Sequence, residues 1–160
     1  MKTLDFLQNN VGGVWGMRCI PRKEMVQVLL NEKMNTCAVK YKNSDNVVDI
    51  RVIDYNAYNF VEEYEDNDAN GVWHITIEGV LPALDRNSEA IIKRLQREEV
   101  FVLVMDQNGT IRLCGTELAL LRFFTKKQTG ESPNALNGIT FSLSCYQERE
   151  TYIITSEEVV

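Results

Sequence analysis

The residues between Asp106 and Glu117 have the spacing that comes closest to a binding motif, a calcium loop. Asp106, Asn108 and Glu117 occupy the first, third and twelfth positions of an EF-hand, where calcium needs oxygen ligands. The sixth position, where that loop needs glycine, is Ile111, and the fifth is Thr110 rather than a carboxylate. A hairpin explains the segment better, so we expect no calcium site here.

Other residue types that could do chemistry lack the partners that chemistry needs. His74 is the only histidine and falls on the polar side of a predicted strand, with no serine or cysteine nucleophile motif nearby. The glycine-rich run 11–16 lacks the Lys-Ser/Thr ending of a phosphate loop. We find no nucleophile elbow, metal triad or cofactor loop. The sequence therefore predicts a protein that is not an enzyme, with no catalytic, metal-binding or cofactor-binding residue.

The four cysteines show no CxxC spacing, and two of them fall in strand patterns. Buried free thiols are the favoured interpretation, and a metal or disulfide set is the alternative. The cysteines are Cys19, Cys37, Cys114 and Cys145.

The elements that would position these groups are clearest between residues 85 and 115. Asn87 or Ser88 can cap a helix whose apolar residues fall on one face and whose basic residues fall on the other. The unbroken apolar run 100–105 then predicts a strand buried on both faces. Asn108 and Gly109 predict a type I′ hairpin turn, in which both central residues need positive φ.

Residues 54–71 combine aromatic and acidic side chains in a way that permits several interpretations. Tyr55, Tyr58, Phe60 and Tyr64 interleave with carboxylates. The segment is either a solvated long loop or hairpin arm with aromatic residues over its base, or an arm that binds another protein, since exposed aromatic residues mark interfaces. A calcium site is a third, weaker option, because the carboxylate spacing matches no known loop. On the second interpretation the arm would be dispensable for folding and needed for assembly.

Composition limits the class of protein. A chain of 160 residues with 44% hydrophobic and 25% charged residues is expected to form one soluble domain over 1–160. The net charge of −6 argues against tight nucleic-acid binding. No apolar run is long enough for a membrane span, and the N-terminus lacks a signal-peptide core, so we expect a cytoplasmic location. Residues 1–10 and 156–160 are expected to be frayed.

The pattern along the chain predicts about seven to nine strands and one helix. Alternation is clear in 47–53, 73–78 and 139–145, whereas 24–30 is ambiguous between helix and strand. We therefore expect a mainly β fold with one helix (α+β), arranged as an antiparallel β-sandwich or open barrel with the helix packed against it.

The order of several short motifs resembles that of phage and prophage tail proteins, of the tail-tube or tail-completion type, found in Bacteroidetes-associated elements. The resemblance covers roughly residues 11–145 and is strongest in the last sixty of them. The motifs are Gly12-Gly13 before a strand ending in Ile20-Pro21, Gly71-Val72-Trp73 leading into Gly79-Val80-Leu81-Pro82, Asp106-x-Asn108-Gly109, Leu113-x-Gly115-Thr116, Leu121-Arg122-Phe123, Thr129-Gly130, Asn137-Gly138 and Phe141-x-Leu143-Ser144.

This resemblance implies a virion structural protein that assembles into rings such as hexamers and contacts other tail proteins. It would be made in the bacterial host cytoplasm and end in the virion tail. The candidate assembly interface would then be the arm with Tyr55, Tyr58, Phe60 and Tyr64. The irregular region 21–46 and the acidic tail after Tyr152 depart from the pattern and leave tube, terminator and neck roles open. The competing hypothesis is a monomeric sandwich or barrel that binds a small ligand or peptide.

Overall fold

A computed structural model describes residues 13–51, 58–67, 70–82, 86–128 and 138–160. These residues form eleven strands, one α-helix and one short 3₁₀ helix. The elements are β1 (Val14–Pro21), η1 (Arg22–Glu24), β2 (Met25–Asn31), β3 (Thr36–Tyr41), β4 (Val48–Arg51), β5 (Tyr58–Asn67), β6 (Asn70–Pro82), α1 (Arg86–Leu95), β7 (Glu99–Asp106), β8 (Ile111–Cys114), β9 (Leu121–Gln128), β10 (Gly138–Gln147) and β11 (Tyr152–Val159).

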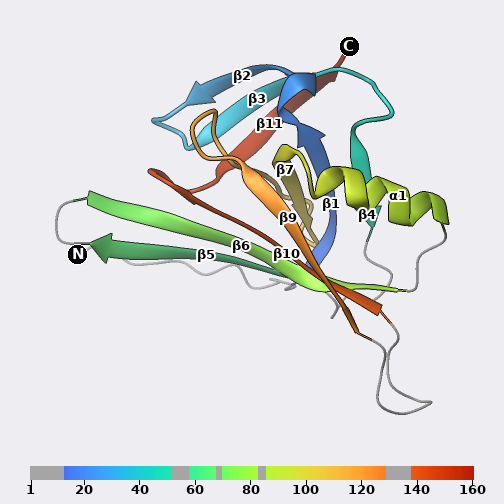
Figure 1. The fold of residues 1–160 in the computed structure, drawn as a ribbon. Coiled ribbons are helices and arrows are strands. Elements are labelled where there is room, and N and C mark those ends of the chain that lie inside the picture. The colour runs from blue at the N-terminus through green and yellow to red at the C-terminus, as the bar shows by residue number, and fades with distance from the viewer. Residues whose placement is uncertain (1–12, 52–57, 68–69, 83–85, 129–137) are drawn as a thin grey trace.

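The strands form one large sheet that bends into two layers and does not close. Its order is β2-β3-β11-β8-β7-β9-β10-β6-β5, and β1 pairs with β7 and β4 off this path. Figure 1 shows β9, β10, β6 and β5 below and β2, β3 and β11 above. The mainly β, sandwich-like fold with one helix is confirmed. The sheet is mixed rather than purely antiparallel, because β11 pairs with β3 in parallel.

Strand β7 is the centre of the fold. Val100, Val102 and Val104 face one hydrophobic core, which the lower layer and α1 complete. Phe101 and Leu103 face a second core, which they share with β3, β8 and β11. The apolar run therefore is a strand buried on both faces, as its unbroken hydrophobicity predicted.

Helix α1 packs with Ile92 and Leu95 in the first core, while Ile91 remains exposed. It begins at Arg86, so Asn87 and Ser88 lie in its first turn and the predicted cap at either residue is wrong. The helix ends at Leu95, and the next bonds, such as Arg97 N to Arg94 O at 3.0 Å, tighten into a turn before β7. The short helix leaves room for β7 to begin directly after it.

The C-terminal residues are ordered by pairing, so the expectation of fraying over 156–160 is wrong. Residues up to Val159 belong to β11, and Glu158 pairs with Lys40 of β3 at 2.6 Å. Glu157 contacts both Arg18 and the Tyr41 hydroxyl. Lys40, Arg18 and Tyr41 are distant from this segment in sequence, so the local pattern of acidic residues could not predict these contacts. The other expected frayed segment, 1–10, lies outside the described residues.

The ambiguous segment 24–30 is strand β2 from Met25 onward, paired with β3. Strand β10 was predicted well: Ile139, Phe141, Leu143 and Cys145 all face the first core. The alternation of apolar and polar residues is uninterrupted in β10, so it predicted that strand. Leu29 interrupts the alternation in β2, and the sequence therefore left β2 ambiguous.

Candidate functional site

The predicted arm is a hairpin of β5 and β6, with β5 at one end of the sheet. The structure does not bring its three described aromatic residues together on the surface. Tyr58 is buried, its ring centre lies 5.0 Å from that of Phe141, and burial raises the pKa of its hydroxyl to about 12. Phe60 packs against the same core, whereas Tyr64 is 54% exposed and contacts Trp73. Tyr55 lies outside the described residues.

The described carboxylates of the hairpin differ in their exposure and partners. Glu62 points inward and accepts hydrogen bonds from Thr151, at 2.5 Å from the backbone nitrogen and 3.0 Å from the hydroxyl. This contact fastens the hairpin to the turn between β10 and β11. Glu63 and Asp66 are exposed along the open edge. The hairpin is therefore anchored at its base and presents an acidic outer edge.

The turn residues Asn108 and Gly109 lie between β7 and β8, where the sequence placed them. Gly109 has φ of +81°, but Asn108 does not share positive φ, so the predicted type I′ turn is wrong. The Asp106 carboxylate accepts hydrogen bonds from the nitrogens of Asn108 and Thr110, at 2.8 and 2.9 Å. This side-chain bonding favours a type I turn followed by a glycine bulge. The Asp106 oxygen that the calcium hypothesis needed is used within the turn.

All four cysteines are free and buried, as the scattered spacing predicted. Burial raises the pKa of Cys19 to about 12 and the pKa values of Cys37 and Cys145 to about 11, and it raises the pKa of Cys114 strongly. A thiol with so high a pKa is a poor nucleophile. Within the described ranges, no group of three or more His, Cys, Asp or Glu side chains is placed to hold a metal ion.

His74 lies on the outer side of β6, as expected. Its ring stacks on that of Tyr146 with centres 4.3 Å apart, and its Nδ1 lies 3.7 Å from a Glu65 oxygen. The stacked ring and the nearby carboxylate are contacts that a histidine on the surface of a sheet commonly makes.

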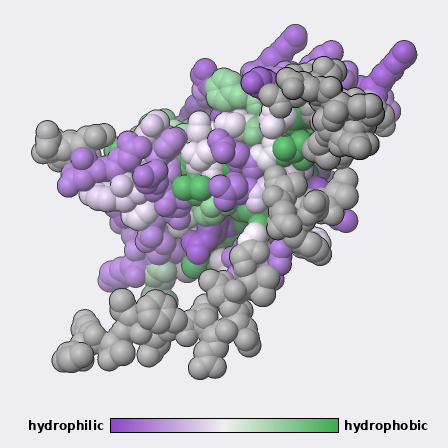
Figure 2. Space-filling model, turned by 90° about the horizontal axis from the view of Figure 1, so that it is seen from below, coloured by the Kyte–Doolittle hydropathy of each residue, from purple (hydrophilic) through white to green (hydrophobic). Residues whose placement is uncertain are grey.

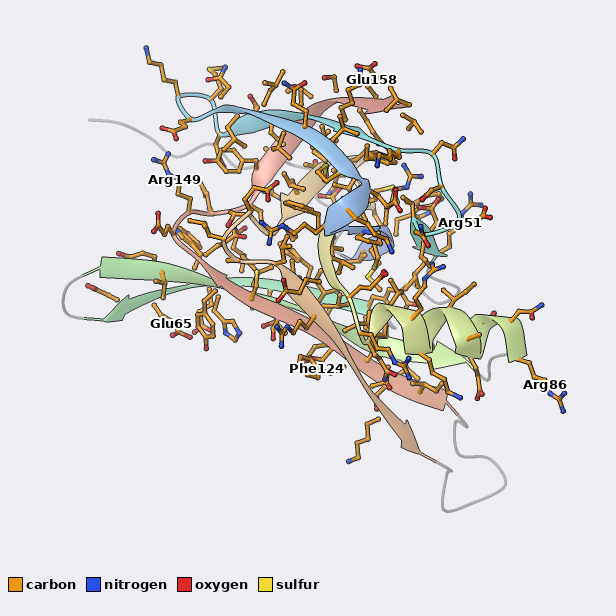
Figure 3. The ribbon with its side chains drawn as sticks, turned by 45° about the horizontal axis from the view of Figure 1, so that its top comes forward. Arg51, Glu65, Arg86, Phe124, Arg149 and Glu158 are labelled. Atoms are coloured by element: carbon orange, nitrogen blue, oxygen red, sulfur yellow. The ribbon has the colours of Figure 1, made fainter. Side chains whose placement is uncertain are left out.

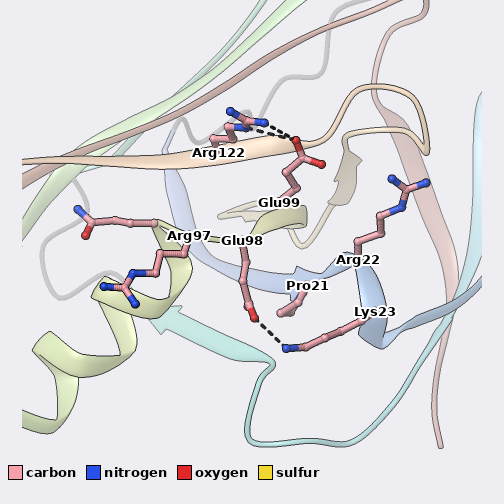
Figure 4. A pocket seen from close by; sticks show the side chains of 8 residues that line it. Pro21, Arg22, Lys23, Arg97, Glu98, Glu99 and Arg122 are labelled. Carbon is pink, nitrogen blue, oxygen red and sulfur yellow. Dashed lines mark hydrogen bonds and ion pairs between the residues drawn. The ribbon is translucent and has the colours of Figure 1, made fainter.

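A shallow pocket of about 510 Å³ lies where η1 meets the start of β7 (Figure 4). Lys23 pairs with Glu98 at 2.8 Å, and Arg122 pairs with Glu99 at 2.7 Å. Each carboxylate is engaged by a cation through one oxygen, and exposed pairs of this kind contribute little to stability. The other Glu98 oxygen, Oε2, is buried without a hydrogen-bond partner among the described residues.

A second hollow is more apolar, and we call it the interlayer groove. It has a volume of about 500 Å³ and lies between β2, the turn after β8 and the end of β10. Phe101, Leu113 and Tyr152 are its buried apolar side chains. Leu30 and Tyr146 at its sides are 50% and 55% exposed, and Leu118 is 95% exposed. Its volume lies within the range of ligand pockets, about 300–1,000 Å³, and its lining is mainly apolar.

Sequence reasoning did not find the interlayer groove. Strand β9 begins only at Leu121, and an isolated bridge between Thr116 and Ala119 puts Leu118 at the tip of a tight turn. The break at Gly115-Thr116 was the available signal. The residues that line the groove come from turns and strands far apart in sequence, which no local pattern joins.

Comparisons with protein-family models, with curated proteins and with solved structures found no match to this chain. In the part of the chain that the structure describes, no helix is long and apolar enough to cross a bilayer.

Proposed function

We propose that this chain is a phage or prophage virion structural protein. It is a tail-tube or tail-completion subunit that assembles with copies of itself into rings such as hexamers. It acts through surfaces rather than through catalysis. It is made in the cytoplasm of a bacterial host, contacts other tail proteins, and ends in the virion tail. The order of the sequence motifs supports the family, and one feature of the fold supports the assembly.

That feature is the pair of open strands at the two ends of the sheet. β2 pairs only with β3 and β5 only with β6 among the described strands. β2 exposes Val26, Leu29 and Leu30, whereas β5 exposes acidic side chains. A long, apolar and unprotected edge such as β2 is a template for pairing with another chain. Two different open edges on one chain suit the heterologous contacts from which rings are built.

The absolute mass of the purified full chain tests this proposal. We expect multi-angle light scattering to show a mass that rises with concentration, and electron micrographs of the heaviest fraction to show rings or short tubes. A monomer at every concentration, alone and with other tail proteins from the same genome, would contradict the assembly.

The interlayer groove favours a second candidate, a monomeric binding module for a small ligand or peptide. The same measurement separates the two candidates. A module of this kind stays monomeric and gains thermal stability when its ligand is added.

A further inference from the structure

The rim of the interlayer groove is acidic around an apolar interior. Glu32, Glu117 and Glu148 line it together with a single basic residue, Arg149. Arg149 pairs with Glu32 at 3.0 Å, which connects the turn after β2 to the turn between β10 and β11 across the groove. Glu117 is paired as well, with Arg22 at 3.4 Å. Three carboxylates against two guanidinium groups still leave the rim with one net negative charge. The groove therefore suits an apolar side chain flanked by basic residues.

Strand β9 presents a group of that kind, which we call the β9 ridge: Arg122, Phe124 and Lys126. Alternate residues of a strand point to the same face, so the three stand in one row on the outer side of the lower layer. Their neighbours across the ladder on β10 are Ser144, Ser142 and Thr140. All three neighbours are small, so they do not cover the row.

Phe124 is 58% exposed at the centre of the β9 ridge, and Figure 3 shows it beneath the strand, away from α1. Seen from this side, the described surface is mainly hydrophilic with scattered hydrophobic side chains (Figure 2). A large aromatic ring between two cations is typical of residues that anchor an interface.

We propose that the β9 ridge of one copy of this chain docks in the interlayer groove of a second copy. Phe124 enters the apolar interior between Leu30, Leu118 and Tyr146. Arg122 and Lys126 approach the rim glutamates, and their opposite charges favour this orientation. In the free chain Arg122 pairs with Glu99 on an exposed surface, a contact that costs little to exchange.

The ridge and the groove share no residue, although Tyr146 of the groove lies on β10 two residues beyond Ser144, the neighbour of Arg122. The docking requires that one copy use both surfaces at once with two different neighbours. Contacts of this heterologous type repeat into rings or filaments. The inference rests on the proposed self-assembly and adds a contact to the open edges of β2 and β5.

Two single substitutions and a matched control test the docking. Phe124→Ala removes the ridge anchor, and Leu118→Asp places a charge in the groove at a residue whose exposure makes it unimportant for folding. Met34→Asp changes another exposed apolar residue, which does not line the groove. We expect each of the first two to raise the concentration needed for association by about tenfold or more, and the control to leave it unchanged. Circular dichroism melts verify that all three variants fold.

Mixing the two defective variants gives the sharper result. Each retains one intact surface, so an equimolar mixture of Phe124→Ala and Leu118→Asp should form pairs of chains and nothing larger, whereas each variant alone stays monomeric. A charge exchange is the second check: Arg122→Glu should weaken association, and Glu117→Arg in the partner copy should restore part of it.

The outcomes separate this inference from the proposed function. If the wild type forms rings and the Phe124 and Leu118 variants form them equally well, the docking is overturned, the assembly stands, and the groove belongs to another partner. If the wild type never associates, even with other tail proteins, both are overturned.

Discussion

Gly109 has a backbone conformation that costs other residues free energy. Its φ is +81°, and a Cβ added there would meet no atom within 4 Å. The cost of a substitution is therefore conformational rather than steric. We expect Gly109→Val to lower the free energy of unfolding by about 1–2 kcal/mol, since a β-branched residue resists positive φ. Thermal and urea unfolding of the variant would measure the loss.

Gly109→Asn is the matched control, because asparagine tolerates this region better. Its melting temperature should fall clearly less than that of the valine variant. An equal fall in melting temperature in the two variants would mean that the positive φ of Gly109 is not the source of the loss.

Arg18 joins its own strand, β1, to three other strands through charged and polar contacts. Its guanidinium donates to both Asp49 oxygens, at 2.5 and 2.9 Å, and to the Tyr41 hydroxyl, and it contacts Glu157. The hydrogen bond from Arg18 lowers the pKa of Asp49 below its usual 3.8. A carboxyl with a lowered pKa stabilises the fold while ionised, and this stabilisation is lost as the pH falls through its folded-state pKa.

The resulting pH dependence can be measured with Asp49→Asn. Wild type should melt at a higher temperature than the variant at neutral pH, and the difference should shrink as the pH drops below about 3.8. A difference that stays constant from pH 7 to pH 3 would show that Asp49 acts through its shape alone. Because the pair is partly exposed, added salt should also reduce the difference.

At the scale of elements, the C-terminal half of β11 is a structural part of the upper layer. Beyond the side-chain contacts of Glu157 and Glu158, Val160 exchanges backbone hydrogen bonds with Tyr41 and Asn43, at 2.9 and 2.7 Å. Deleting 156–160 should therefore lower the free energy of unfolding by about 2–4 kcal/mol. Glu158→Gln, which removes only an exposed ion pair, should cost less than about 1 kcal/mol. Chemical denaturation of the two variants would test the difference.

The β5–β6 hairpin cannot be removed as freely as an independent arm, because Tyr58 belongs to the first core. Deletion of 54–71 would take out this side chain and the Glu62–Thr151 anchor. Tyr58→Ala should cost about 3–5 kcal/mol by leaving a cavity, and Tyr64→Ala about 1 kcal/mol or less. If assembly depends on the exposed part of the hairpin, only Tyr64→Ala would weaken association in a chain that is still fully folded.

Elements whose pattern is local could be predicted from the sequence. The apolar run of β7, the hairpin after it and the alternation of β10 each specify their own structure within a few residues. Tyr58 and Phe60 also fall at even spacing and pack in the first core, but Glu62 interrupts the pattern before the exposed Tyr64. The partner of Glu62, Thr151, is 89 residues away, so the sequence could not show that a carboxylate is satisfied there.

The candidate surfaces were harder to predict than the elements. The interlayer groove is formed where β2, the turn after β8 and the end of β10 meet, and only the bending of the sheet brings them together. The β9 ridge did leave a local signal, since Arg122 and Lys126 at alternate positions around Phe124 indicate a solvent-facing row. The sequence could therefore indicate the β9 ridge but not the interlayer groove.

At the scale of the whole molecule, the charge of the chain is distributed unevenly over its surfaces. Acidic side chains lie on the β5 edge and on the groove rim, and the β9 ridge is basic. If opposite charges direct association, raising the salt concentration from about 50 to 500 mM should weaken it, because Debye screening shortens the range of attraction below about 5 Å. Light scattering at fixed protein concentration would measure this, and stronger association at high salt would indicate a contact dominated by apolar surface.

The parallel pairing of β3 with β11 has a consequence for how the chain is made. Tyr41 and Glu157, which meet in that pairing, are 116 residues apart. The N-terminal part emerges from the ribosome first, so β3 emerges well before β11 and cannot pair with it until β11 has been translated. Until then Cys37 and Val39 lack part of their core, and one edge of β3 stays open to other nascent chains. Translation that stops before Tyr152 would therefore release a product whose upper layer cannot close.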